Sequence, residues 1–233
     1  MIKSIAFIPA RSGSKRIKNK NIINFNGKPL LAHTILAAKK SKIFNRIVVV
    51  TDSKKYQTIA KKFGAEVPFL RPKKISLDSS PDIEWVKFAI KKLNLNQDEI
   101  FFILRPTSPF RTSKTIKRAW NLFNKNKKKI DSVRAIEICK QHPGKMWILK
   151  GSLIKPLVNK KINGTPYHSN QFKVLPTIYI QNASLEISFV KNVIKKNSIS
   201  GKKIMPFFTK NLEGIDINYQ EDLNFIKKFK KNS

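Results

Sequence analysis

Short apolar runs alternate with helical patterns along the chain. Three of these runs, at residues 5–10, 46–51 and 100–104, predict buried strands. The run at 46–51 is rich in β-branched residues and almost wholly apolar, as a central strand of a parallel sheet should be. Pro29 suits a helix start, and apolar residues recur at helical spacing after it. This order of strands and helices predicts an α/β fold with a mainly parallel sheet covered by helices.

Further elements continue the same pattern. One further helix is predicted at 53–63, and a last one at 219–229. Two more are expected to begin at capping residues, one at Asp82 and one at Thr112 or Ser113. The other predicted strands lie at 66–69, 131–138, 177–180 and 185–190. No internal repeat is visible, and 233 residues are within the usual range for one α/β domain. We therefore expect residues 1–233 to form a single domain.

The stretch from about 140 to 180 interrupts the pattern. Its apolar pieces are short, and prolines and glycines separate them: Pro143, Gly144, Gly151, Pro156, Gly164, Pro166 and Pro176. We expect loops and hairpins inserted into the sheet domain, with the insertion at about 141–173. A segment of this kind is suited to a lid or to a contact between subunits.

The composition fits a folded protein outside the membrane. Hydrophobic residues make up 41% of the chain, enough for a real core. No apolar run approaches the roughly 18 residues of a membrane-spanning helix, and the apolar amino terminus is too short for a signal peptide. Cys139 is the only cysteine, which excludes an internal disulfide framework, and it reads as a buried strand residue. We expect a cytoplasmic protein with no membrane partner.

A formal net charge of +34 raises the question of nucleic-acid binding. The basic residues are 40 lysines and only 8 arginines, whereas bidentate recognition of phosphates and bases favours arginine. The lysines are also spread along the whole chain. We therefore expect no specific nucleic-acid partner, although adventitious affinity for polyanions at low salt is consistent with this charge.

The segment after the first predicted strand carries the first candidate chemistry. It reads Ala-Arg-Ser-Gly-Ser-Lys-Arg over residues 10–16 and lies at the carboxyl end of its strand, where open α/β sheets bind ligands. Gly13 permits a tight turn, hydroxyls flank it, and several cations follow, which together fit a polyphosphate. A solvated basic turn explains the same residues equally well. Neither dinucleotide nor Walker glycine patterns are present, so hydride transfer and ATP hydrolysis lose support.

The acidic residues point to a metal near the carboxyl terminus. The chain has only 14, yet four fall within ten positions: Glu213, Asp216, Glu221 and Asp222. Transfer of a nucleotide phosphate normally needs Mg²⁺, which prefers carboxylate ligands. Asp216 lies in an alternating stretch and is the expected ligand, whereas Glu221 and Asp222 suit the first turn of a helix.

Six sequence blocks carry a resemblance to a known family. They are Ala10-Arg11-x-x-Ser14-Lys15 with Lys20-Asn21, Arg71-Pro72 with Asp78, Arg105-Pro106-Thr107-Ser108-Pro109-Phe110-Arg111, His142-Pro143-x-Lys145-Met146-Trp147, Gln181-Asn182-Ala183-Ser184-Leu185-Glu186, and Gly214-Ile215-Asp216-Ile217-Asn218. Together they resemble acylneuraminate cytidylyltransferases, which make CMP-sialic acids and related sugars. The blocks stand in the family's order and cover nearly the whole chain.

The resemblance implies a Rossmann-like nucleotidyltransferase fold and a division of roles. CTP phosphates and cytidine would be bound by the first loop and one later arginine: Arg11, Ser14, Lys15, Lys20, Asn21 and Arg71. The expected catalytic residues are Arg11, Lys20 and Asp216, with Mg²⁺ held by Asp216 and Asn218. In the implied reaction, the anomeric hydroxyl of an acidic nine-carbon keto sugar attacks the α-phosphorus of CTP, and pyrophosphate leaves.

The resemblance also implies a sugar site and a dimer. The expected sugar contacts are Arg105, Ser108, Lys145, Gln171 and Asn182. In this family the equivalent of Lys145 often comes from the neighbouring subunit, so the inserted segment is expected to pair two subunits in a homodimer.

Three departures from the family's pattern fall on the sugar side. Asn218 stands where a second aspartate is usual, Arg105 replaces a glutamine, and Asn170 replaces an arginine before Gln171. The identity of the sugar therefore does not transfer from the resemblance. Two alternatives remain open: a related nucleotidyltransferase that uses an eight-carbon keto acid or a sugar phosphate, and a non-catalytic homologue that binds polyanions.

Overall fold

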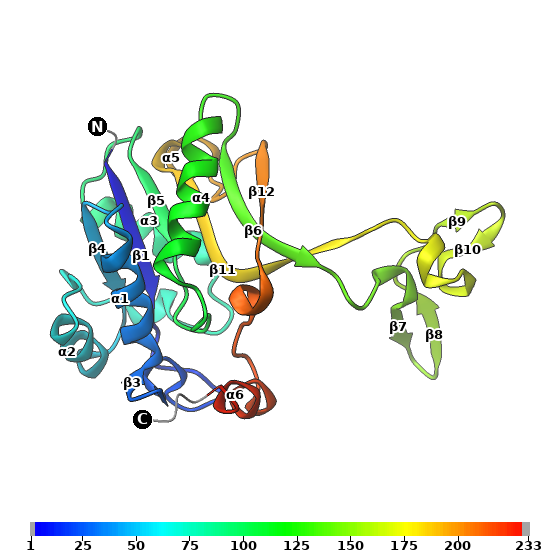
Figure 1. The fold of residues 1–233 in the computed structure, drawn as a ribbon, viewed down its shortest axis with the longest axis horizontal. Coiled ribbons are helices and arrows are strands. Elements are labelled where there is room, and N and C mark those ends of the chain that lie inside the picture. Colours follow the sequence, from blue (N-terminus) through cyan, green and yellow to red (C-terminus); the bar gives the residue numbers. More distant parts are fainter. Residues whose placement is uncertain (1–2, 230–233) are drawn as a thin grey trace. The chain divides into compact units, whose positions relative to one another are not determined.

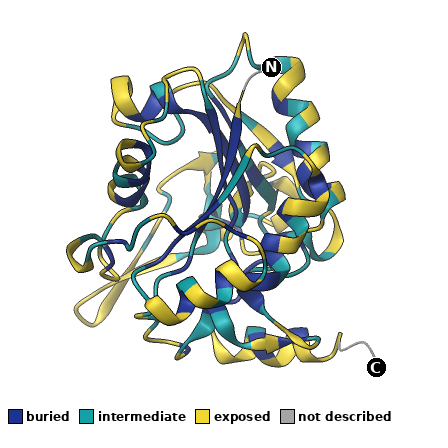
Figure 2. Ribbon diagram, turned by 90° about the vertical axis from the view of Figure 1, so that its left-hand side faces the viewer, coloured by how far each residue is buried: buried dark blue, intermediate teal, exposed yellow. Residues whose placement is uncertain are grey.

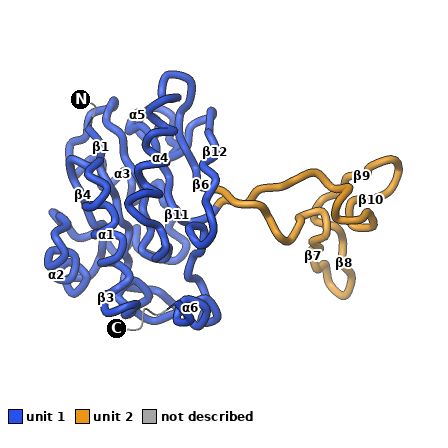
Figure 3. Tube along the Cα trace, in the orientation of Figure 1, with its two compact units in different colours: residues 1–135, 182–233 blue, residues 136–181 orange. Residues whose placement is uncertain are grey.

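A computed structural model of the chain describes residues 3–229. The chain divides into two compact units (Figure 3): a core unit, from residues 1–135 and 182–233, and an inserted unit, residues 136–181. The strands β6 (Ser132–Ile138) and β11 (Tyr179–Phe189) lead out of the core unit and back into it.

The core unit is built on a sheet that has six strands within the described residues (Figure 1). Their order is β12 (Ile204–Phe208), β6, β11, β5 (Ile100–Ile103), β1 (Ser4–Pro9) and β4 (Arg46–Val50). β1 pairs in parallel with β4 and β5, whereas β11 pairs antiparallel with β5. The predicted α/β fold with a mostly parallel sheet is confirmed.

Helices cover both faces of this sheet, as the alternation along β1 requires. Ala6 and Ile8 pack in a cluster with residues of α1 (Leu30–Ser41), α2 (Lys54–Lys62) and α4 (Ser113–Asn126). Ile5 and Phe7 pack on the other face, against α3 (Asp82–Lys92) and α5 (Val190–Lys196). In Figure 2 the buried strands run between helices whose outer faces are exposed.

A third apolar cluster joins the two ends of the chain. Ile17 and Phe25, with Leu30 at the start of α1, pack against Ile217 and against Leu223 of α6 (Gln220–Lys227). The segment between Ile17 and α1 contains a 3₁₀ turn, η1 (Lys20–Ile22), and a small hairpin, β2 (Asn24–Phe25) and β3 (Lys28–Pro29). This packing brings the first loop beside the segment that carries Asp216.

The inserted unit contains short elements and little buried apolar surface. Its two hairpins are β7 (Trp147–Lys150) with β8 (Leu153–Pro156), and β9 (Lys161–Ile162) with β10 (Thr165–Pro166). Three 3₁₀ turns accompany them: η3 (Pro143–Lys145), η4 (Tyr167–Ser169) and η5 (Phe172–Val174). His142 is buried, accepts from the Gly144 amide at Nδ1 (2.9 Å) and contacts the Pro176 carbonyl through Nε2 (3.0 Å).

Several predicted elements differ from the structure. The strand predicted at 66–69 is a single bridge between Glu66 and Val48. Asp82 is not the cap of α3, because Pro81 holds that position and the Asp82 carboxylate accepts from Trp85 Nε1 (2.7 Å). Cys139 is only half-buried and lies after the end of β6.

The carboxyl-terminal half of the sheet also differs from prediction. The strands predicted at 177–180 and 185–190 are one strand, β11, which runs through the polar residues between them. Helix α5 and strand β12 were not predicted. β12 contains Pro206, which a strand tolerates at the edge of a sheet, where β12 lies. Thr112 caps α4 as predicted, in a reciprocal pair with Thr115. Among the described helices none has the length and apolarity to cross a bilayer.

Candidate active site

The first loop is held in shape from both sides. It follows β1, and Ser12 donates to Asp52, just beyond β4, through its backbone N–H (2.8 Å to Oδ1) and its hydroxyl (3.0 Å to Oδ2). On the other side, buried Asn21 donates from Nδ2 to the Arg11 carbonyl (3.0 Å). Asn21 therefore supports the loop from within. Asp52 was not singled out from the sequence, although its place at the end of a buried strand is a usable signal.

Two cations of this loop share one carboxylate. Arg11 Nη2 forms an ion pair with Asp78 Oδ1, and Lys15 Nζ lies 3.1 Å from Asp78 Oδ2. Both cations lower the pKa of Asp78, first through the hydrogen bond from Arg11. The Arg11 side chain is 31% exposed and that of Lys15 is 83% exposed, so both are within reach of a solvent-borne anion. Ser14 is half-buried in the same loop.

Arg71 is buried and bonded to backbone carbonyls. Its backbone N–H donates to the Thr51 carbonyl (2.7 Å), and its side chain donates to the Ile75 carbonyl (2.6 Å from Nε). The guanidinium lies 6.0 Å from the ring centroid of Trp85. Burial lowers the pKa of Arg71, and the nearby carboxylate of Asp82 opposes that shift. In this arrangement Arg71 orders the segment that carries Asp78.

Lys20 connects the first loop to the carboxyl-terminal segment. Its Nζ donates to the carbonyl of Ile217 (2.6 Å), which is 197 residues away in sequence, and lies 3.5 Å from Asn218 Oδ1. Burial lowers the pKa of Lys20, and the charge of Asp216 opposes that shift. The predicted catalytic residues Lys20 and Asp216 therefore lie close together.

Asp216 has one carboxylate oxygen that is buried without a hydrogen-bond partner in the described part of the chain. The other oxygen, Oδ2, accepts from Asn218 Nδ2 (2.7 Å). The Ile217 N–H donates to the Thr107 carbonyl (2.9 Å), which fixes this segment beside the loop after β5. An unpartnered buried carboxylate oxygen costs free energy, so a cation at Oδ1 fits this arrangement.

The neighbouring acids are already engaged. Asp222 Oδ2 accepts from the N–H groups of Asn218 (2.7 Å) and Tyr219 (2.8 Å), as a residue in the first turn of a helix does. Glu213 accepts from Thr115 Oγ1 (2.7 Å) and pairs with Arg118 (2.7 Å). Within residues 3–229 no group of three or more His, Cys, Asp or Glu side chains could enclose a metal ion. Mg²⁺ does not require such a group, because one or two protein ligands suffice when phosphates and waters complete its coordination shell.

Asn218 is oriented differently from an oxygen ligand. Its amide nitrogen faces Asp216, and its oxygen faces Lys20. The amide would have to turn for its oxygen to share a cation with Asp216.

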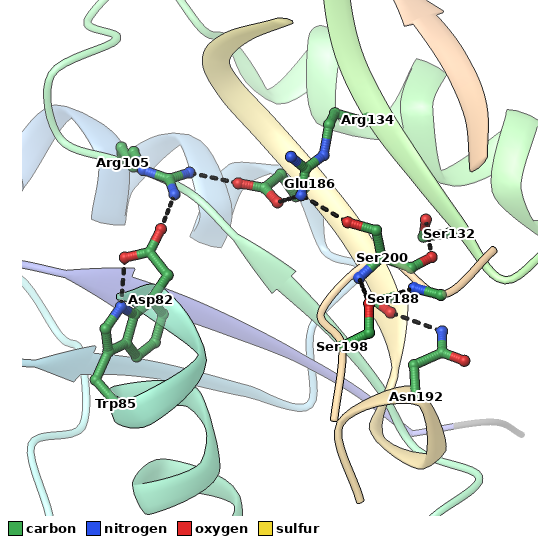
Figure 4. A network of polar contacts seen from close by, with 11 residues as sticks. Asp82, Trp85, Arg105, Ser132, Arg134, Glu186, Ser188, Asn192, Ser198 and Ser200 are labelled. Atoms are coloured by element: carbon green, nitrogen blue, oxygen red, sulfur yellow. Dashed lines mark hydrogen bonds and ion pairs between the residues drawn. The ribbon is translucent and has the colours of Figure 1, made fainter. Parts of the chain in front are cut away.

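Arg105 lies in a network of ion pairs (Figure 4). Its Nη1 pairs with Glu186 Oε1 (2.7 Å) and its Nη2 with Asp82. The second Glu186 oxygen pairs with Arg134, which also donates to Ser200 Oγ (2.8 Å). Burial opposes the charge of Arg105, but the two carboxylates together raise its pKa. The two arginines and two carboxylates balance, so the Arg105 guanidinium is engaged within the protein.

The loop after β5 is clamped by a buried arginine. Arg111 is 2% exposed and donates to Thr34 Oγ1 (2.8 Å), to the Arg105 carbonyl (3.0 Å) and to the Ser184 carbonyl. Burial lowers its pKa to about 9, so it stays protonated at neutral pH. Ser108 is buried in this loop, and its hydroxyl has no hydrogen-bond partner among the described residues. Arg111, Asp82, Arg134 and Glu186 were not predicted as site residues, because their partners are distant in sequence.

The remaining predicted sugar contacts are divided between the core unit and the inserted unit. Asn182 begins the return of the chain to the core unit and donates to Thr209 Oγ1 (2.9 Å). Lys145 and Gln171 lie in the inserted unit, where Lys145 Nζ donates to the carbonyls of His168 (2.9 Å) and Asn170. Gln171 is exposed before η5.

Comparisons with known proteins identify the family of the chain. A sequence model described as cytidylyltransferase matches residues 5–232. A relative from Legionella pneumophila, named CMP-N,N'-diacetyllegionaminic acid synthase, is 34% identical over 236 residues, which cover 97% of this chain and 96% of the relative. An Escherichia coli N-acylneuraminate cytidylyltransferase is 46% identical over 122 residues, 52% of this chain and 28% of that one.

Solved structures agree on the fold. CMP:2-keto-3-deoxy-manno-octonic acid synthetase, solved in complex with CTP, matches with a TM-score of 0.67 over 97% of this chain and 98% of that one. The sequence identity is 12%, so this likeness speaks for the fold alone. Because the family model and the Legionella relative both span nearly the whole sequence, this chain belongs to the cytidylyltransferase family of enzymes.

Proposed function

We propose that this enzyme transfers CMP from CTP to the anomeric hydroxyl of an acidic nine-carbon keto sugar and releases pyrophosphate. One observation carries the proposal. Lys20 brings a cationic loop at the end of β1 to the segment that carries Asp216, whose Oδ1 has no hydrogen-bond partner in the part of the chain that the structure describes. The Legionella relative, which matches over 97% of this chain, is named as a synthase of CMP-N,N'-diacetyllegionaminic acid. A CTP-dependent reaction also fits the cytoplasmic location expected from the sequence.

The residues of the first loop would bind and neutralise the triphosphate. Arg11 and Lys15 present exposed cations, and Lys20 supplies a third from a more buried position. The sugar hydroxyl forms a bond to the α-phosphorus as the bond to the pyrophosphate oxygen breaks, and the hydroxyl proton leaves to solvent or base. These cations would stabilise the charge that develops on the departing pyrophosphate.

Mg²⁺ fits the carboxyl-terminal segment. Asp216 would hold it through Oδ1, and Asn218 would add an amide oxygen after turning away from Lys20. When bound, the ion supplies charge neutralisation at the phosphates.

The sugar would be bound by the loop after β5 and by the residues at which the chain re-enters the core unit. The buried hydroxyl of Ser108 has no hydrogen-bond partner within residues 3–229, and Asn182 lies at the boundary of the core unit. Arg105 is balanced by Asp82 and Glu186, so in this proposal it contributes shape and hydrogen bonds more than net charge.

We also propose a homodimer formed through the inserted unit. Large apolar side chains are exposed there, among them Trp147 (45%), Leu149 (73%), Leu153 (74%), Ile154 (58%) and Phe172 (53%). Clustered exposed apolar residues mark protein contacts. In such a dimer, Lys145 and Gln171 of one subunit would reach the sugar site of the other.

A charge in the β7–β8 hairpin tests the dimer. Leu149→Asp with Leu153→Asp should turn a dimer into a monomer in sedimentation equilibrium. Ile194→Asp is the matched control, because Ile194 is 57% exposed on α5 of the core unit. A monomeric wild-type protein, or a double variant that remains dimeric, contradicts this interface.

The reaction itself is tested by pyrophosphate release. Purified protein with Mg²⁺ is given each of the four nucleoside triphosphates and a panel of keto-sugar acids and sugar phosphates. We expect release only with CTP and a nine-carbon acid. Release with an eight-carbon acid or a sugar phosphate would favour the related nucleotidyltransferase, and failure to bind CTP would favour a non-catalytic polyanion-binding homologue.

A further inference from the structure

One exposed carboxylate forms ion pairs with two of the cations proposed to bind CTP. Asp78 pairs with Arg11 through Oδ1 and with Lys15 through Oδ2. Carboxylate and phosphate oxygens compete for the same nitrogen donors, since both form charge-assisted hydrogen bonds with guanidinium and ammonium groups. The Arg11 and Lys15 nitrogens therefore cannot pair fully with Asp78 and with a phosphate at once.

Asp78 lies on a turn whose base is anchored and whose tip is exposed. Arg71 donates to the Ile75 carbonyl, and Ser76 Oγ donates to the Pro72 carbonyl (2.9 Å), which holds the 3₁₀ turn η2 (Lys73–Ile75) in place. Beyond this anchor, residues 77–79 are exposed, and the Asp78 side chain is 33% exposed. The carboxylate can therefore leave the loop cations without loss of buried contacts at the base of the turn.

A second carboxylate at this loop, that of Asp52, makes different contacts. Asp52 bonds to the backbone N–H and the hydroxyl of Ser12, and so supports the loop without occupying its cations. Of these two acids, Asp78 is the one that pairs with the cations proposed to bind CTP.

We propose that Asp78 is an internal counterion of the nucleotide loop, which competes with phosphates for Arg11 and Lys15 and so weakens the binding of CTP and of pyrophosphate. This inference rests on the proposed function. In the free enzyme Asp78 neutralises the two cations. CTP displaces it, and its return to Arg11 and Lys15 promotes the departure of pyrophosphate. Asp78 is thus a positioning residue that acts through these two side chains.

The expected effect is modest, because exposed ion pairs are weak. Removal of the Asp78 charge should tighten CTP and pyrophosphate binding about two- to fivefold, and the gain should shrink as salt screens the charges. Arg11 and Lys15 lower the pKa of Asp78 below that of an ordinary aspartate. The carboxylate is therefore charged at neutral pH, where the binding is measured.

The experiment measures CTP and pyrophosphate binding by calorimetry without Mg²⁺, at low and high salt, for wild type and Asp78→Asn. Asp78→Glu keeps the charge and should bind nearly as wild type does. Asp98→Asn is the control for net charge, because Asp98 is exposed just before β5, and the loop follows the other end of the parallel strand β1. In a Lys15→Ala background, Asp78→Asn should give a smaller gain than in wild type.

The outcomes separate this inference from the function on which it rests. Tighter CTP and pyrophosphate binding by Asp78→Asn, with Asp98→Asn unchanged, supports the counterion. Unchanged or weaker binding by Asp78→Asn, where wild type binds CTP, overturns the inference and leaves the proposed function standing. A wild-type protein that binds no CTP overturns both.

Discussion

Two groups of arginine–carboxylate pairs in the core unit differ in their charge balance and in the burial of the carboxylate that two cations share. At the first loop, Arg11 and Lys15 share the exposed carboxylate of Asp78, so positive charge remains in excess. In the network around Glu186, which is 7% exposed, Arg105 and Arg134 share this carboxylate, and Asp82 completes an even balance. Exposed pairs exchange readily with solvent anions, whereas removal of one partner from a buried pair leaves an uncompensated charge. The first region is therefore suited to binding phosphates and the second to holding strands and loop in register.

The largest expected effect comes from Asp216, whose Oδ1 has no hydrogen-bond partner among the residues that the structure describes. Asp216→Asn removes the charge at nearly constant shape and should lower kcat by at least about a hundredfold. CTP binding measured without Mg²⁺ should persist, because the loop cations remain. Glu221→Gln is the control, an exposed acid in the first turn of α6. Wild-type turnover by Asp216→Asn would contradict the metal role.

A second prediction concerns the buried network. Glu186→Gln leaves Arg105 and Arg134 without their shared charge and should lower the free energy of unfolding by about 2–3 kcal/mol, toward the low end for buried pairs because both arginines are partly exposed. Glu66→Gln breaks the surface pair with Arg46 and should cost under about 1 kcal/mol. Urea unfolding of both variants measures the difference. Equal losses would show that burial does not distinguish the two kinds of pair.

A third and smaller effect sharpens the same contrast. Raising KCl from about 50 to about 500 mM should weaken CTP binding about tenfold, since salt screens exposed charges. The unfolding penalty of Glu186→Gln should change by less than about 0.5 kcal/mol over the same range, because buried pairs are screened less. Calorimetry and urea titration at both salts give the two numbers. A CTP affinity that does not respond to salt would argue against binding by the loop cations.

The sequence predicted those elements that are marked by an apolar run or a capping residue within a few positions. The strands β1, β4 and β5 and the Thr112 cap follow from apolar runs and from one capping residue. The short helix α5 and the proline-containing edge strand β12 were not predicted, because their apolar patterns are short and depend on neighbours in the fold.

The candidate site divides in the same way. The first loop and Asp216 were found from residue types and from the family resemblance, and the structure brings Lys20 and Asp216 together through packing between the chain ends. The engagement of Arg105 could not be predicted, since Asp82 and Glu186 lie 23 and 81 residues away from it in sequence. Pairings of that range depend on the fold rather than on spacing.

The most direct test of the contrast is a side-by-side measurement of CTP affinity, without Mg²⁺, for Arg11→Ala and Arg105→Gln. We predict that Arg11→Ala weakens CTP binding at least about tenfold, as expected for a lost charge-assisted hydrogen bond. Arg105→Gln should stay within about twofold of wild type, because its charge is already matched inside the protein. Loss of CTP binding by Arg105→Gln, with Arg11→Ala binding as wild type does, would contradict the account.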